Sequence, residues 1–177
     1  MQGYLKNSFW AAALLLGSHA FAAPQLQPQP KSQTQPLLRG SYQKIIAAHA
    51  GKPFIVAMWS VSCTHCGADL EIFGRLAKKY ADFDLVLIST DSPEQEATIV
   101  SSLKKYNLGL EGSKHKRAGK VESWVFADSY AERLRFEVDT QWYGELPRTY
   151  FFDAAGKERG VSGVLDENTV EQWVKAH

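Results

Sequence analysis

Residues 54–66 of this 177-residue chain read FIVAMWSVSCTHC, an apolar run followed closely by two cysteines. The run from Phe54 to Trp59 has the length of a strand and contains no polar residue, which is typical of a central strand covered on both faces. Cys63 and Cys66 are the only cysteines of the chain. We expect a helix to extend from about Cys63 to Tyr80, with its apolar residues at three- and four-residue spacing.

The close spacing of the cysteines indicates reactivity rather than stapling, because a disulfide scaffold joins cysteines that lie far apart in the sequence. N–H groups at a helix N-terminus stabilise a thiolate there. We therefore expect Cys63, outside the helix proper, to be the nucleophile and Cys66 to be the resolving thiol. His65, when protonated or hydrogen-bonded, would lower the pKa of Cys63 and make the pair more oxidising.

Other uses of the same residues fit less well. A c-type haem site requires His directly after the second cysteine, where Gly67 stands. A structural zinc site requires four ligands, and no second cysteine pair completes it. The spacing of Thr and Arg around the cysteine of a peroxiredoxin is absent. Binding of Cu(I) by Cys63 and Cys66, with or without His65, remains an alternative.

The rest of the sequence predicts alternating strands and helices around this site. Asp91-Ser92-Pro93-Glu94 combines a cap residue with an early proline and predicts a helix start. The order of elements predicts an α/β protein with parallel crossovers, to which a hairpin adds antiparallel strands at the edge of the sheet. The expected elements are helices at 42–50, 91–106 and 129–136, strands at 84–89, 123–126, 148–153 and 158–164, and a last helix capped by Asp166.

The N-terminal 36 residues differ from the remainder in composition. Lys6, the apolar stretch 8–17 and the small-x-small sequence Ala20-Phe21-Ala22 predict a signal peptide that is cleaved after Ala22, and hence a periplasmic protein. The apolar stretch is shorter than the about 20 residues that span a bilayer, so a retained anchor is the weaker alternative. The expected organisation is a signal peptide at 1–22, a Pro/Gln-rich linker at 23–36 and one domain at 37–177.

The charge of the chain excludes a general affinity for nucleic acid. Lys and Arg number 20 and Asp and Glu number 19, which gives a formal net charge of +1. No global field therefore attracts a polyanion. The basic run at 114–117 is flanked by Gly and Ser, and we expect it to be a solvated loop.

The stretch Trp59-Ser60-Val61-Ser62-Cys63-Thr64-His65-Cys66, with Pro147 before a later strand, resembles the thioredoxin superfamily, and within it the exported branch related to TlpA and ResA. The resemblance covers residues 37–177 and implies a thioredoxin-like three-layer α/β/α sandwich with a mixed sheet. It also implies a cis Leu146–Pro147 bond that faces the cysteines, and a Trp59 that packs beside the disulfide.

The same resemblance implies a protein disulfide oxidoreductase that needs no cofactor beyond its redox-active disulfide. Its expected partners are client proteins with disulfides or thiols, and a redox partner that donates or accepts electrons, for which a membrane protein is one candidate. No nucleic acid is expected among them.

The sequence departs from the family pattern in ways that leave the redox direction open. Many relatives have Trp where Ser62 stands. Ala57 replaces the buried acid that helps to deprotonate the second cysteine in classical thioredoxins. Asp69 and Glu71 are candidates for that role, although we expect both to be solvated charges on the helix face.

Overall fold

A six-stranded mixed sheet in the order β1-β4-β3-β2-β5-β6 forms the centre of the protein. The computed structural model describes residues 32–80, 82, 84–109 and 120–177; the predicted signal peptide, most of the predicted linker and the basic run lie outside them. The elements are β1 (Gln35–Leu37), α1 (Ser41–Ala48), β2 (Phe54–Trp59), α2 (Cys66–Lys79), β3 (Leu85–Ser89), η1 (Pro93–Gln95), α3 (Glu96–Lys105), β4 (Val121–Phe126), α4 (Ala131–Val138), β5 (Arg148–Phe152), β6 (Glu158–Ser162) and α5 (Glu167–Ala176).

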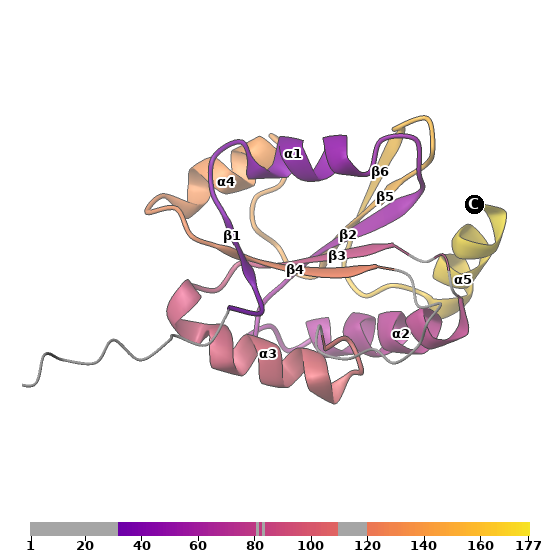
Figure 1. Cartoon of the computed structure of the whole chain (residues 1–177), viewed down its shortest axis with the longest axis horizontal. Helices are drawn as coiled ribbons and strands as arrows, with labels where there is room; N and C mark the ends of the chain where they lie inside the picture. Colours follow the sequence, from indigo (N-terminus) through magenta and orange to yellow (C-terminus); the bar gives the residue numbers. More distant parts are fainter. Residues whose placement is uncertain (1–31, 81, 83, 110–119) are drawn as a thin grey trace, which may run out of the picture. The chain divides into compact units, whose positions relative to one another are not determined.

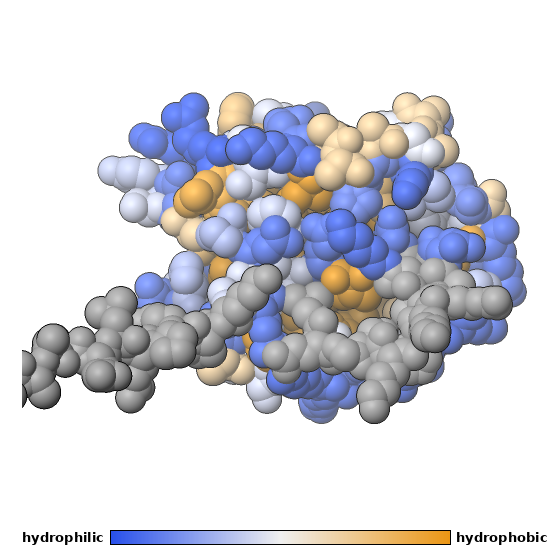
Figure 2. Space-filling model, in the orientation of Figure 1, coloured by the Kyte–Doolittle hydropathy of each residue, from blue (hydrophilic) through white to orange (hydrophobic). Residues whose placement is uncertain are grey.

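Helices cover both faces of the sheet, so the predicted α/β sandwich is confirmed. Helices α1 and α4 lie on one face, and α2 and α3 lie on the other (Figure 1). Every residue of β2 is buried. Successive side chains of β2 point to opposite faces of the sheet and enter two separate cores. Ile55, Ala57 and Trp59 pack in the core on the α2 side, and Phe54, Val56 and Met58 pack in the core on the α1 side. On the face shown in Figure 2, hydrophilic residues separate the hydrophobic ones into small patches, which agrees with a core that lies inside.

The topology brings three chain segments to one edge of the sheet. Strands β2 and β3 are parallel, so their C-terminal ends lie at the same edge. Strand β5 is antiparallel to β2 and begins at that edge, where Met58 pairs with Arg148. The loop that follows Trp59, the turn after Ser89 and the residues before Arg148 therefore meet there.

The first strand begins before the predicted domain boundary. Strand β1 starts at Gln35 and pairs in parallel with β4, whereas the sequence placed the boundary between linker and domain at residue 37. Just before it, Gln33 N and Thr34 N donate hydrogen bonds of 2.7 and 3.1 Å to Oε1 of Glu96. Glu96, from a distant part of the chain, thus holds Gln33 and Thr34 in place, although these two residues have little apolar surface to bury.

None of the helices in the described part of the chain is both long enough and apolar enough to cross a membrane.

Candidate functional site

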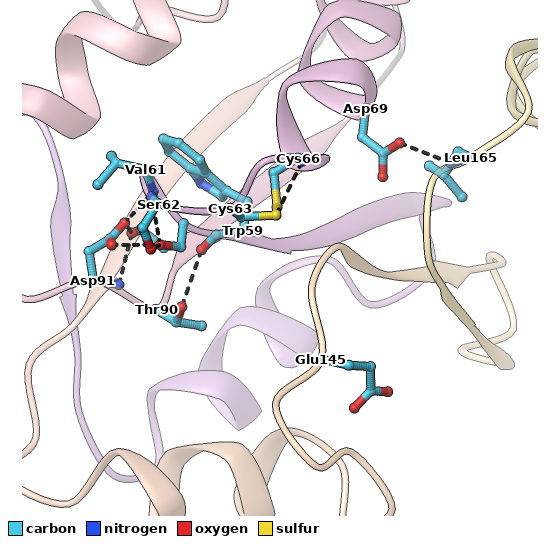
Figure 3. The surroundings of a disulfide bond; sticks show 12 residues. Trp59, Val61, Ser62, Cys63, Cys66, Asp69, Thr90, Asp91, Glu145 and Leu165 are labelled. Atoms are coloured by element: carbon cyan, nitrogen blue, oxygen red, sulfur yellow. Dashed lines mark hydrogen bonds between the residues drawn. A yellow bond between two sulfur atoms is a disulfide. The ribbon is translucent and has the colours of Figure 1, made fainter.

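Cys63 and Cys66 form a disulfide at the N-terminus of α2, with their Sγ atoms 2.10 Å and their Cα atoms 5.4 Å apart (Figure 3). Cys63 is partly exposed, whereas Cys66 is only 1 % exposed. An incoming thiol or disulfide can therefore reach Cys63 and not Cys66. The helix begins at Cys66 rather than at Cys63, so the first cysteine lies in the turn that leads into it.

The main chain of α2 contacts the sulfur of Cys63 directly. Cys66 N donates a hydrogen bond of 3.1 Å to Cys63 Sγ. This N–H is one of the groups at the helix start that have no partner within the helix. After reduction, the same N–H and the helix dipole would stabilise a thiolate on Cys63.

His65 lies between the cysteines and precedes the first residue of α2. Its side chain is exposed, and no side-chain hydrogen bond of His65 is found among the described residues. A positive charge on this imidazole would favour a thiolate on Cys63.

Gly67 and Gly74 of α2 both face Tyr106, the residue that ends α3. A Cβ atom on Gly67 would lie 2.6 Å from the Tyr106 hydroxyl, and a Cβ atom on Gly74 would collide with the Tyr106 carbonyl oxygen. Tyr106, at the C-terminus of α3, packs against the core that contains Cys66. Two glycines of α2 thus let α3 approach the active-site helix closely.

The β2–β5 ladder ends at the Met58–Arg148 pair, and Trp59 and Pro147 are the next residue along each chain segment. The Leu146–Pro147 bond is cis. Trp59 is 3 % exposed and packs in the same core as both cysteines. The five residues predicted for the site therefore all lie near the C-terminal end of β2: Trp59, Cys63, His65, Cys66 and Pro147.

The loop before Pro147 is held firmly and presents one aromatic ring to solvent. Trp142 is buried, and its Nε1 donates a hydrogen bond of 2.8 Å to Glu145 O. Glu145 accepts hydrogen bonds from Tyr143 N and from Ser162 Oγ. The Tyr143 side chain is 91 % exposed.

The sequence matches no family model and no curated protein. Solved structures do match. A secreted Mycobacterium tuberculosis disulfide oxidoreductase homologous to E. coli DsbE superposes with a TM-score of 0.53 at 20 % identity, over 74 % of this chain and 86 % of the other. A thiol:disulfide interchange protein of the thioredoxin family from Chlorobium tepidum gives 0.53 at 20 % identity, over 73 % and 82 %. Mycobacterium tuberculosis DsbF gives 0.52 at 18 % identity, over 73 % and 83 %.

The chain has the thioredoxin fold. The resemblance stated from residues 59–66 and Pro147 is thereby confirmed at the level of the fold.

In this thioredoxin-like site the buried acid lies on α2 instead of β2. Asp69 is 3 % exposed, so the prediction that it is a solvated charge is wrong. Its Oδ1 accepts a hydrogen bond of 2.9 Å from Leu165 N, while its Oδ2 is buried with no hydrogen-bond partner among the described residues. Burial raises the pKa of Asp69 to about 6, against the opposing effect of the Leu165 hydrogen bond. Glu71 is solvated as predicted, with its side chain 63 % exposed and paired with Arg75.

The position opposite Ala57 carries a polar residue, Thr149, that was not among the site residues predicted from the sequence. Thr149 pairs with Ala57 across the β2–β5 ladder and is fully buried. Its Oγ1 is without a hydrogen-bond partner in the described part of the chain. Only the strand register could have revealed this neighbour, because the two residues lie far apart in the sequence.

No three His, Cys, Asp or Glu side chains in the described ranges lie together as a metal site would require.

Proposed function

We propose that the protein is an exported thiol–disulfide oxidoreductase that exchanges disulfides with client proteins through Cys63 and Cys66. The observation that carries the proposal is the disulfide at the start of α2, in which one sulfur is accessible and the other is buried. The solved structures with this fold are described as disulfide oxidoreductases or thiol:disulfide interchange proteins, which supports the same chemistry.

The reductive cycle uses both cysteines. The Cys63 thiolate attacks a client disulfide, so that a mixed disulfide forms and one client thiolate leaves. The Cys66 thiolate then attacks Cys63 Sγ, which closes the Cys63–Cys66 disulfide and releases the second client thiolate. The client gains two electrons and two protons, and the protein loses them. An external protein dithiol must reduce the pair again.

Asp69 is the proposed proton acceptor for Cys66. The two residues are three positions apart on α2, a spacing that places side chains on one helix face. Cys66 is buried, so its thiol needs a nearby base before it can attack. Among the described residues the Asp69 Oδ2 atom has no hydrogen-bond partner, so it can accept that proton, and a pKa of about 6 leaves most of the carboxyl ionised at neutral pH.

The loop before Pro147 forms the proposed client surface, and Trp59 and Pro147, which are both buried, would support it from within the fold. Trp59 and Pro147 directly continue the two strands beyond the last pair of the β2–β5 ladder, Met58–Arg148. Tyr143 adds an exposed ring on a loop that Trp142 and Glu145 hold in place. A rigid tyrosine provides contact area at a small entropic cost.

Export is part of the proposal because the chemistry needs a compartment where disulfides persist. It rests on the signal peptide predicted at residues 1–22 and on the domain that follows. One solved structure with this fold is described as secreted.

Reduction of insulin disulfides by dithiothreitol tests the proposal. We expect the protein to accelerate it, Cys63→Ser to abolish the acceleration, and Cys66→Ser to accumulate a mixed disulfide that mass spectrometry detects. Equal rates for Cys63→Ser and the parent would refute the function.

The copper alternative is tested separately. Tight binding of Cu(I) by the reduced protein, without any thiol exchange, would favour it.

A further inference from the structure

The carboxylate of Asp91 holds the loop that carries Cys63. Asp91 follows β3 and is buried. Its Oδ1 accepts a hydrogen bond of 2.7 Å from Ser60 Oγ, and its Oδ2 accepts one of 2.9 Å from Val61 N (Figure 3). The sequence assigned Asp91 to a helix start, but Ser92 is the residue that precedes η1 as its N-cap. The Asp91 side chain is instead directed at the segment between β2 and the disulfide.

Ser89, the last residue of β3, also holds the Asp91 carboxylate. Ser89 Oγ donates a hydrogen bond of 2.5 Å to Asp91 Oδ2 and accepts one of 3.1 Å from Asp91 N. Asp91 therefore cannot move towards or away from the loop without breaking its hydrogen bonds to Ser89.

Ser60 extends the network as far as the residue before Cys63. Ser62 N donates a hydrogen bond of 3.1 Å to Ser60 Oγ, and the two serine hydroxyls are 2.9 Å apart. Cys63 N also donates to Ser60 O at 3.2 Å. Ser62 occupies the position at which many relatives have Trp. In this chain a hydrogen-bonded carboxylate, rather than a packed ring, shapes the approach to the nucleophile.

The charge on Asp91 also matters for the chemistry. Its three described donors, the Ser60 hydroxyl, the Val61 amide and the Ser89 hydroxyl, are all neutral. They satisfy the carboxylate without cancelling its charge. A buried charge is poorly screened by salt, so it opposes a second negative charge nearby. The second charge here is the thiolate that forms on Cys63 when the disulfide is reduced.

We propose that Asp91 is a positioning residue that fixes residues 60–62 and that its negative charge favours the Cys63–Cys66 disulfide over the reduced pair. This inference rests on the proposed function and gives it a direction: the protein works as a reductant. Destabilising the reduced form makes a dithiol a stronger reductant, just as stabilising that form makes an oxidant. The exposed His65 acts in the opposite sense, and solvent screens it more strongly.

Equilibration of the purified protein with reduced and oxidised glutathione tests the effect of the charge. Asp91→Asn should shift the equilibrium towards the reduced protein by roughly fivefold, as expected when a buried negative charge that opposes the thiolate is removed. The rate at which iodoacetamide alkylates Cys63 should begin to rise at a lower pH in the same variant. Asp128→Asn removes a carboxylate from the loop after β4 and serves as the matched control, with no shift in the equilibrium expected.

Ser60→Ala separates position from charge, because it breaks the link to Ser62 and leaves Asp91 charged. It should slow the reduction of insulin several-fold while moving the glutathione equilibrium less than Asp91→Asn does. If Asp91→Asn does not fold, Asp91→Ser removes the same charge. An unchanged equilibrium, or a shift towards the disulfide, in the charge-removing variant would overturn the inference.

The glutathione and alkylation measurements need no client protein. If the parent fails to reduce insulin, the proposed function fails, whereas the effect of Asp91 on the cysteine pair is still measured. If the parent reduces insulin and the equilibrium does not move, only the inference on Asp91 fails.

Discussion

Leu165 N donates a hydrogen bond of 2.9 Å to Asp69 Oδ1 and so joins the segment after β6 to the first turns of the active-site helix. Both residues are buried. The contact explains why an acidic residue on α2 points inward. The buried Leu165 N–H has no access to water, and the Asp69 carboxylate supplies the hydrogen-bond acceptor that it needs. Because Oδ2 remains without a partner in the described part of the chain, the ionised form of Asp69 is only partly compensated.

Asp69 should make the oxidised protein less stable as the pH rises. Its pKa is about 6 in the folded state against an ordinary value of 3.8, so the folded state holds the proton more tightly. The stabilisation is complete below about pH 4 and is lost as the pH rises through about 6. The difference corresponds to about 3 kcal/mol. Urea unfolding at pH 4 and pH 7 should show this loss in the parent and not in Asp69→Asn; identical pH dependence in both would contradict it.

The resolving step should depend on the same residue. We expect Asp69→Asn to leave the attack of Cys63 on insulin largely intact and to slow the release of the mixed disulfide by roughly 10²-fold, as for loss of a general base. Stopped-flow kinetics with a quench of the mixed disulfide measures the two steps separately. Glu71→Gln, on the exposed face of the same helix, is the control and should change neither.

The two glycines of α2 should differ in how they tolerate alanine. Gly74→Ala drives a methyl group into the backbone of Tyr106, so we expect a loss of about 2–3 kcal/mol in unfolding free energy. Gly67→Ala meets only the hydroxyl end of that side chain. The double variant Gly67→Ala/Tyr106→Phe should therefore recover the stability lost in Gly67→Ala. Thermal or urea unfolding decides this, and no recovery would show that the clash lies elsewhere.

Substitutions of the neighbours Tyr143 and Trp142 should have different effects, the first on client binding and the second on the free energy of unfolding. Tyr143 is 91 % exposed, so Tyr143→Ala should leave unfolding unchanged and raise KM for a client several-fold with little change in kcat. Trp142→Ala should instead cost about 3–5 kcal/mol, because it empties a buried site. An unchanged KM in Tyr143→Ala would remove this ring from the client surface.

The N-cap of α5 should contribute measurably to the free energy of unfolding. Asp166 Oδ1 accepts hydrogen bonds of 2.9 Å from both Thr169 N and Thr169 Oγ1. Asp166→Ala should lower the unfolding free energy by about 1 kcal/mol. Asp166→Asn keeps an acceptor and should cost less; equal losses would indicate that the cap hydrogen bond is not the cause.

The elements predicted from the sequence were those with local signals. The apolar run that forms β2 was placed at its observed bounds, and Asp166 was placed as the cap of the last helix. Strand β1 was missed because Gln35 and Pro36 have no strand signal, and only pairing with β4 orders them. Patterns within a segment are visible in a sequence, whereas a partner from elsewhere in the fold is not.

The candidate site shows the same division. Cys63 and Cys66 are recognisable from their spacing alone. Asp69 was taken for a solvated charge because helix periodicity does not reveal that Leu165 covers it. Asp91 looked like part of a helix start, and only the parallel pairing of β2 with β3 brings it to the loop before Cys63.

The hydrogen bond from Cys66 N to Cys63 Sγ has a consequence for how this protein could diversify. The donor is a peptide group, so no substitution of Thr64 or His65 that preserves the turn deletes it. Substitutions of Thr64 and His65 can therefore change the reduction potential of the cysteine pair. The backbone N–H that stabilises a thiolate on Cys63 is retained as long as the helix begins at Cys66. Variation in that dipeptide should alter which way electrons flow without erasing the capacity for exchange.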